Sequence, residues 1–178
     1  MKDLSYHILD IVQNSLHAGA MNIEIDISES AVSGRLCLKV SDDGCGMTAL
    51  MSQRVADPFF TTSVKKKVGL GLPLLKQNAE QTGGTFTIES AENKGTLVTA
   101  TFDLRHIDMI PVGDLASTFK ILIAANPEEH IIYRHTSDRY GFELDTAEIR
   151  DGIGGISLNT REVLEFIVEF INNNLKEL

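Results

Sequence analysis

Apolar and polar residues alternate along this chain with two different periods. Apolar residues recur every third or fourth position in several stretches, which predicts amphipathic helices at residues 4–18, 70–81 and 160–177. They alternate with polar residues elsewhere, which predicts strands at residues 22–28, 35–41, 85–90 and 96–103. Weaker patterns predict a helix followed by a hairpin, at residues 109–120, 129–135 and 140–145.

The order of these elements predicts the fold class. Helices and strands are interleaved over residues 1–104, so we expect an α+β two-layer sandwich there, with a mixed, mostly antiparallel sheet and helices on one face. Residues 105–178 are expected to form a small C-terminal α/β extension, helix–hairpin–helix in order, that packs on the first domain. Residues 47–68 have weak periodicity, which predicts a short helix followed by a mobile cover.

Charge and composition narrow the classes of function. The 178 residues carry a net charge of −9 with a pI of about 5.0, which disfavours nonspecific binding to nucleic acid. The sequence contains no apolar run long enough to span a membrane and no signal peptide. Because Cys37 and Cys45 form no disulfide or zinc framework, a reducing, cytoplasmic setting is expected.

The first predicted helix carries side chains that suit a metal ion and a proton transfer. His7, Asp10, Asn14 and His17 are spaced by three or four residues and therefore share one face. The carboxamide oxygen of Asn14 suits Mg²⁺, and the carboxylate of Asp10 suits a catalytic role as proton acceptor. A polar stripe facing water, or a buried histidine bonded to backbone, would explain the same residues without any such role.

A glycine-containing turn follows the strand at residues 35–41. The carboxylate of Asp42 can accept a hydrogen bond from an exocyclic amine such as that of adenine, and Gly44 and Gly46 let the backbone approach a flat ring. A plain Asp-Gly turn is the simpler interpretation. A calcium loop is disfavoured because Gln53 stands where the closing glutamate is required.

A second glycine turn opens the helix at residues 70–81. Gly69 and Gly71 stand at its start, where free backbone N–H groups bind phosphate. The sequence Asp-Pro-Phe-Phe-Thr-Thr at 57–62 offers aromatic anchors for the cover, and the lysines at 65–67 offer charge for a triphosphate. A helix kink and a solvated loop are the alternatives. The sequence has no P-loop and no eukaryotic-type kinase motif.

Together these motifs resemble the GHKL superfamily, which comprises histidine-kinase ATPase domains, type II topoisomerases, mismatch-repair ATPases and heat-shock chaperone relatives. The resemblance covers residues 1–104 and implies a Bergerat-type fold with ATP and Mg²⁺ as cofactors. It implies that Asn14 binds Mg²⁺, that Asp42 reads adenine, and that a lid spans about residues 48–68. It also implies nucleotide contacts by Gly44, Gly46, Met47, Phe60, Thr61, Thr62, Lys67, Gly69, Leu70, Gly71, Leu72 and Thr96.

Two departures from the family shape the expected function. Asp10 stands where hydrolytic branches of the family carry a glutamate general base, so hydrolysis is expected to be slow or Asp10 to serve differently. No dimerising helical hairpin and no phosphoacceptor box precede the ATPase motifs. We therefore expect a stand-alone protein kinase that phosphorylates a histidine or serine of a partner in trans. Residues 14–19 are similar to the stand-alone anti-sigma-factor kinases, which act on serine.

Other functions fit the same motifs. The main alternative is an ATP-operated conformational switch or anti-factor with slow hydrolysis, and an inert nucleotide-binding module is a third possibility. The expected partners are ATP and an unidentified protein that supplies the phosphoacceptor or switch target, with no nucleic acid and no membrane. The apolar face around Phe166 and Phe170 in the last helix permits a homodimer or a docking site.

Overall fold

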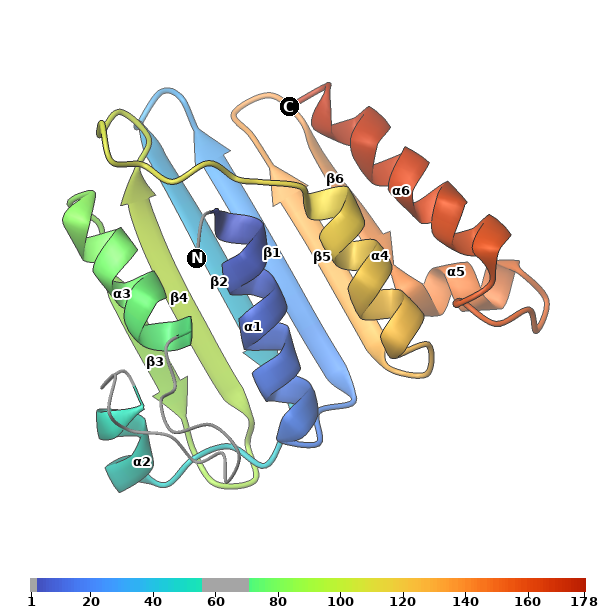
Figure 1. Ribbon diagram of the computed structural model, residues 1–178, viewed down its shortest axis with the longest axis horizontal. Helices are drawn as coiled ribbons and strands as arrows, with labels where there is room; N and C mark the ends of the chain where they lie inside the picture. The colour runs from blue at the N-terminus through green and yellow to red at the C-terminus, as the bar shows by residue number, and fades with distance from the viewer. Residues whose placement is uncertain (1–2, 56–70) are drawn as a thin grey trace.

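The computed structural model describes residues 3–55 and 71–178 (Figure 1). Its helices are α1 (Leu4–His17), α2 (Ala49–Arg54), α3 (Gly71–Gln81), α4 (Leu115–Ala125), α5 (Thr146–Gly152) and α6 (Arg161–Leu175). Its strands are β1 (Asn22–Ser30), β2 (Arg35–Asp42), β3 (Phe86–Ser90), β4 (Thr96–Asp103), β5 (His130–Thr136) and β6 (Gly141–Asp145). None of the helices in the described part of the chain has the length and apolar character needed to cross a bilayer.

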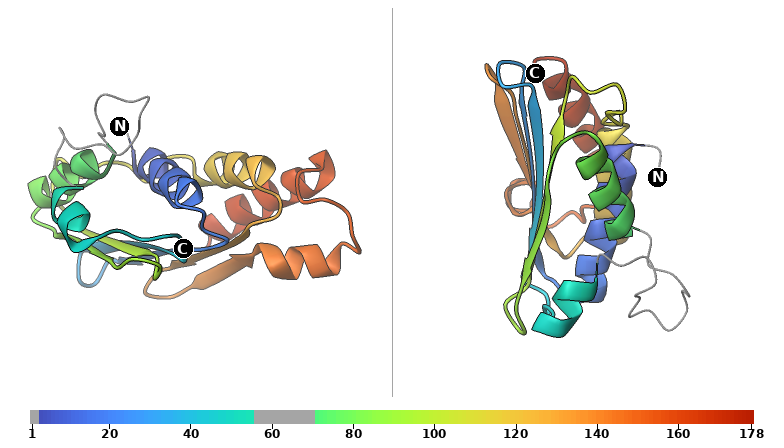
Figure 2. Two further views of the ribbon diagram at one scale, coloured as in Figure 1. Left: turned by 90° about the horizontal axis from the view of Figure 1, so that it is seen from below. Right: turned by 90° about the vertical axis from the view of Figure 1, so that its left-hand side faces the viewer.

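The described strands form one six-stranded sheet in the order β3-β4-β2-β1-β5-β6. Neighbouring strands are antiparallel except for β1 and β5, which run parallel with Ile25 opposite Tyr133. Helices α1, α3, α4 and α6 lie on the same face of this sheet (Figure 2). The predicted α+β sandwich, with a mixed and mostly antiparallel sheet, is therefore confirmed.

The core lies between the sheet and these helices. The apolar positions of β1 that alternate along the strand, Ile23, Ile25 and Ile27, are at most 1% exposed, and they belong to the same buried cluster as the apolar residues of α1. Removing such side chains from water contributes roughly 1.5–3 kcal/mol each. The intervening strand positions are polar and more exposed, so the periodicity that predicted each strand also decides which face the helices cover.

The C-terminal extension adds strands to the sheet instead of forming a separate layer. Strand β5 pairs with β1, and Phe119 of α4 stacks on Tyr133 of β5 with ring centroids 4.1 Å apart. The connection before α4 also crosses the start of α1, where the backbone carbonyls of Pro111 and Val112 accept hydrogen bonds at 2.9 Å from first-turn N–H groups. A helix leaves these groups without internal partners, so the connection completes α1.

Two details differ from the sequence predictions. The helix expected at 109–120 begins at Leu115 and continues to Ala125, because Gly113 adopts a φ of +83° and the Asp114 carboxylate caps the Ser117 N–H at 2.9 Å. The short helix α5 was not predicted. Asp145 caps it by accepting from N–H groups of its first turn, and an aspartate just before helix-forming residues was the available sign.

Candidate functional site

Helix α1 positions the side chains predicted to handle a metal ion and a proton. The Asp3 carboxylate caps the helix by accepting from the Tyr6 N–H at 3.2 Å. Further along, Asp10 is half-buried and Asn14 is exposed, and Asn14 Nδ2 donates to Asp10 Oδ2 at 3.4 Å. Because the amide nitrogen faces Asp10, the amide oxygen of Asn14 is the atom that a cation can use.

The N-terminus of α3 lies directly against Asp10. A Cβ atom placed on Gly71 would come within 1.6 Å of Asp10 Oδ2, so glycine leaves the room that this carboxylate occupies. Leu75 is fully buried and Leu72 packs against the core, which anchors α3 in this position. The two elements predicted to grip one triphosphate, α1 and the start of α3, are therefore immediate neighbours.

His7, one turn before Asp10, belongs to the core. The residue is 0% exposed, and Asn78 Nδ2 on α3 donates to its Nε2 at 2.9 Å. Burial penalises the charged imidazolium and lowers the pKa of His7 to about 4. The polar face predicted for α1 is thus divided, because His7 joins α1 to α3 while the other three members remain accessible.

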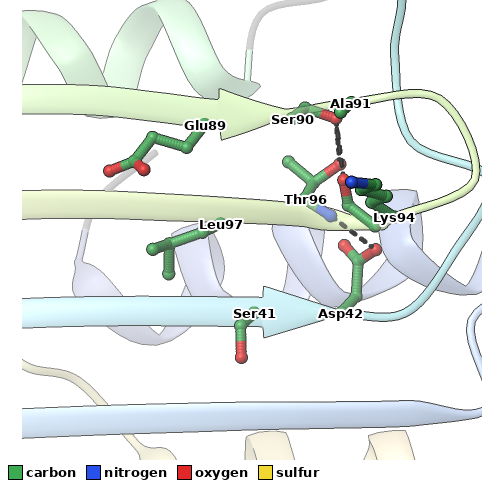
Figure 3. Close-up of a pocket in the computed structure, with 9 residues that line it drawn as sticks. Ser41, Asp42, Glu89, Ser90, Ala91, Lys94, Thr96 and Leu97 are labelled. Carbon is green, nitrogen blue, oxygen red and sulfur yellow. Dashed lines mark hydrogen bonds between the residues drawn. The ribbon is translucent and has the colours of Figure 1, made fainter.

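Both oxygens of Asp42 are held at the end of β2. Ser15 Oγ on α1 donates to Oδ2 at 2.6 Å. The backbone N–H groups of Gly44 and Thr96 donate to Oδ1 at 3.0 and 3.2 Å, and Figure 3 shows the bond from Thr96. Helix α1, the glycine turn and β4 therefore converge on one carboxylate, which they hold in the orientation of a hydrogen-bond acceptor.

The glycines after Asp42 serve the packing of the turn. A Cβ on Gly44 would come within 3.1 Å of the Ala18 carbonyl oxygen at the end of α1. Gly46 adopts a φ of +64°, and a Cβ there would come within 2.0 Å of the Ala91 carbonyl oxygen. The sequence motif predicted that these glycines let a base approach the backbone. The structure adds a second reason, because the protein's own backbone fills the space that a side chain would need.

Asp43 ties this turn to the start of β1. Its Oδ1 accepts from the backbone N–H groups of Met21 and Asn22 at 2.8 and 2.9 Å, and Asn22 Nδ2 donates to Oδ2 at 2.6 Å. These bonds, with that from the Asn22 side chain the largest, lower the pKa of Asp43. This role could not be predicted from the sequence, because Asn22 stands twenty-one residues before Asp43.

A shallow hollow of about 380 Å³ opens beside Asp42 (Figure 3). Part of its lining is a cross-strand row in which Ser41 and Glu89 both pair with Leu97. These residues alternate with positions that face the helices, such as Val98, so they lie on the opposite face of the sheet. The hollow therefore extends onto the face of the sheet opposite the helices.

Several residues that sequence analysis assigned to the site lie outside the described part of the chain: Phe60, Thr61, Thr62, Lys67, Gly69 and Leu70. Among those that are described, Met47 is held by its backbone N–H, which donates to Ser90 Oγ at 2.9 Å. Thr96 is held by the same hydroxyl, 3.0 Å from its own Oγ1. One serine of β3 thus connects the start of the predicted lid to β4.

The described residues contain no cluster of three or more His, Cys, Asp or Glu side chains that could hold a metal by itself. Mg²⁺ is normally bound by one or two protein oxygens together with phosphates and water, so it needs no such cluster. The exposed Asn14 amide, which lies beside Asp10 and therefore close to the start of α3, fits an ion held in that manner.

The sequence also matches known proteins. The model of the family described as "Histidine kinase-, DNA gyrase B-, and HSP90-like ATPase" matches residues 2–106, which is more than half of the chain. "Sensor histidine kinase ZraS" of Klebsiella oxytoca is 37% identical over 93 residues, covering 52% of this chain and 20% of that protein. "Sporulation kinase D" of Bacillus subtilis (strain 168) is 35% identical over 94 residues, covering 53% and 18%. The chain spans about a fifth of the length of these curated relatives.

A likeness of fold reaches further along the chain than the family match. A crystal structure of the N-terminal domain of a DNA repair protein aligns with a TM-score of 0.55 at 16% identity, covering 82% of this chain and 52% of that chain. This coverage exceeds residues 2–106, so it takes in part of the C-terminal extension. At this identity the likeness concerns the fold alone.

Proposed function

This chain belongs to the histidine kinase-, DNA gyrase B- and HSP90-like ATPase family, and we propose that it binds ATP with Mg²⁺ and transfers the terminal phosphoryl group to a partner protein. One observation carries the proposal. Helix α1 contacts the Asp42 carboxylate through Ser15, and it contacts the glycine start of α3 through Asp10. A single rigid element therefore lies between a base-reading group and a phosphate-binding turn.

The order of these groups along α1 gives the nucleotide a direction. In this proposal the adenine lies near Ser15, which bonds to Asp42, and the phosphates lie near Asp10, which is beside Gly71. The two helix positions are about 7–8 Å apart along the axis, at 1.5 Å per residue. In this arrangement Asp42 accepts from the exocyclic amine, and the Asn14 oxygen and the backbone at α3 hold the phosphate end. Bound Mg²⁺ would neutralise charge on the phosphates during in-line transfer.

The acceptor in this proposal belongs to another polypeptide. His7 is fully buried and cannot reach a phosphoryl group. The proposal gives the half-buried Asp10 carboxylate the role of taking the proton of an incoming histidine or serine. Two curated relatives of the first hundred residues are named as kinases, which supports a role in signal transduction. We expect the reaction to take place in the cytoplasm.

The test separates binding from transfer. The purified chain is titrated with ATP in the presence of Mg²⁺ and of a chelator, and then incubated with ATP labelled on the terminal phosphate and isolated phosphoacceptor domains of sensor kinases. Mg²⁺-dependent binding with label on an acceptor supports the kinase. Binding without any labelled acceptor refutes the transfer step, and no binding at all refutes the whole proposal.

A second candidate, an ATP-operated switch, is favoured by the connection between α1 and the extension. The backbone bonds from Leu4 to Pro111 and from Ser5 to Val112, both 2.9 Å, would carry a movement of α1 to the segment before α4. In this case a nonhydrolysable ATP analogue alone should change the oligomeric state or partner binding. If sedimentation shows the same species with and without the analogue, and partner binding is unchanged, the switch is excluded.

A further inference from the structure

We infer that Ser15 is a positioning residue that makes the site selective for adenine over guanine, by holding Asp42 as an acceptor. This inference rests on the proposed function, because it concerns how the same nucleotide is recognised. It was not visible in the sequence, where Ser15 follows the metal ligand candidate Asn14 and falls on the apolar side of the helix.

The geometry of Ser15 distinguishes it from an ordinary serine within a helix. It is 3% exposed, and its Oγ lies 2.6 Å from Asp42 Oδ2 and 3.3 Å from the Ile11 carbonyl oxygen. A hydroxyl has one proton to donate. The shorter contact to a carboxylate is the stronger, charge-assisted bond, so the proton is directed to Asp42 and not along the helix.

The bond determines what Asp42 can recognise. Oδ1 is occupied by two backbone N–H groups, from Gly44 and Thr96, and Oδ2 by Ser15, so the carboxylate is fixed by three elements. Each carboxylate oxygen has a further lone pair, and Oδ2 can therefore accept one more N–H. Adenine presents an amino group at its sixth position, whereas guanine presents a carbonyl oxygen that a carboxylate repels. Without the Ser15 bond, Asp42 would be held through Oδ1 alone, so Oδ2 could turn away from the base and the carboxylate would discriminate less.

The chain offers a matched control on the same helix. Ser5 is also 3% exposed, and its Oγ also donates to a carboxylate, Asp3 Oδ1, at 2.7 Å. Ser5 lies near the opposite end of α1, away from Asp42. Ser5→Ala therefore removes the same kind of buried bond from the same helix without touching the nucleotide site.

The experiment measures Kd for ATP and for GTP, both with Mg²⁺, in the full chain and in Ser15→Ala, Ser5→Ala, Asp42→Asn and the double variant Ser15→Ala/Asp42→Asn. We expect Ser15→Ala to weaken ATP binding about tenfold or more, as for loss of a bond to a charged group, with less than about twofold change for GTP. The ratio of the two Kd values should stay at the wild-type level in Ser5→Ala. Because Ser15 acts through Asp42, the double variant should bind ATP as Asp42→Asn does.

Several results would overturn the inference while leaving the proposed function intact: equal losses for ATP and GTP in Ser15→Ala, or additive losses in the double variant. Absence of nucleotide binding by the wild-type chain would instead refute the proposed function. Thermal unfolding is measured for every variant. If Ser15→Ala does not fold, Ser15→Cys keeps a side chain of similar size with a much weaker donor, and it must lower the ATP-to-GTP preference for the inference to stand.

Discussion

Replacing the buried histidine of α1 should remove a specific acid sensitivity of the fold. In the folded chain His7 is 0% exposed and its pKa is lowered from 6.5 to about 4, mainly by burial. In the unfolded chain the imidazole is solvated and takes up its proton at the ordinary pKa of about 6.5. Between these values the unfolded state binds one more proton than the folded state, so the free energy of unfolding falls as the pH falls.

The size of the effect follows from the two pKa values. One pKa unit corresponds to about 1.4 kcal/mol, so the change from 6.5 to about 4 amounts to about 3.5 kcal/mol at the acid limit. The free energy of unfolding begins to fall below about pH 6.5 and has fallen by about 2 kcal/mol near pH 5. The fall levels off below about pH 4, where both states carry the proton. For a domain with a stability of roughly 5–15 kcal/mol this is a large fraction.

The assay is urea denaturation of wild-type chain and His7→Leu at a series of pH values from about 8 to about 4. Leucine fills a similar volume and cannot be protonated, so the variant should lose less stability on acidification. Relative to wild type, the free energy of unfolding of His7→Leu should rise by about 3 kcal/mol as the pH falls across the series. Low protein concentration is needed, because the pI of about 5.0 favours association within this range.

A histidine on the exposed side of the same helix provides the control. His17 is exposed, and its Nδ1 lies 2.6 Å from the Gln13 carbonyl oxygen. His17→Leu removes an exposed histidine from the same helix and therefore controls for the loss of an imidazole that is not part of the core. Parallel stability curves for wild type and His7→Leu would refute the reasoning, since they would mean that burial of His7 carries no protonation penalty.

Further substitutions test the nucleotide site. Asn14→Ala should abolish Mg²⁺-dependent ATP binding measured by calorimetry, while Gln13→Ala on the same helix should keep it; persistent affinity in the first variant would disprove the metal assignment. Asp42→Asn should weaken ATP binding by about 1–3 kcal/mol, because it leaves a buried donor without its charged partner, and GTP competing as well as ATP for the wild-type chain would contradict the role of Asp42. Gly71→Ala should displace the Asp10 carboxylate and reduce ATP affinity with little change in Tm, so unchanged affinity would assign another role to the turn. Gly46→Ala should lower the free energy of unfolding by at least about 2 kcal/mol in urea, because of its positive φ and the contact with a backbone carbonyl; wild-type stability would rule out this packing.

Much of the fold follows from short-range patterns. Strand periodicity at 22–28 and 35–41, and helical periodicity at 4–18 and 160–177, predicted elements that the structure contains within a few residues. The limits of α4 were less predictable, since its first turn depends on a positive φ at Gly113 and on a connection that bonds to α1. Periodicity reports which residues face a core, whereas helix ends depend on which partners satisfy the terminal backbone groups.

The sequence by itself determined the chemistry available to this protein: a carboxamide and a carboxylate one turn apart on α1, a carboxylate at the end of β2, and glycines at the start of α3. Only the tertiary structure decided how these groups are used. It placed Asp10 against Gly71, buried His7, and directed Ser15 toward Asp42. The physical reason is that residue type and spacing act within one element, whereas burial and hydrogen bonding between elements depend on how helices pack on the sheet.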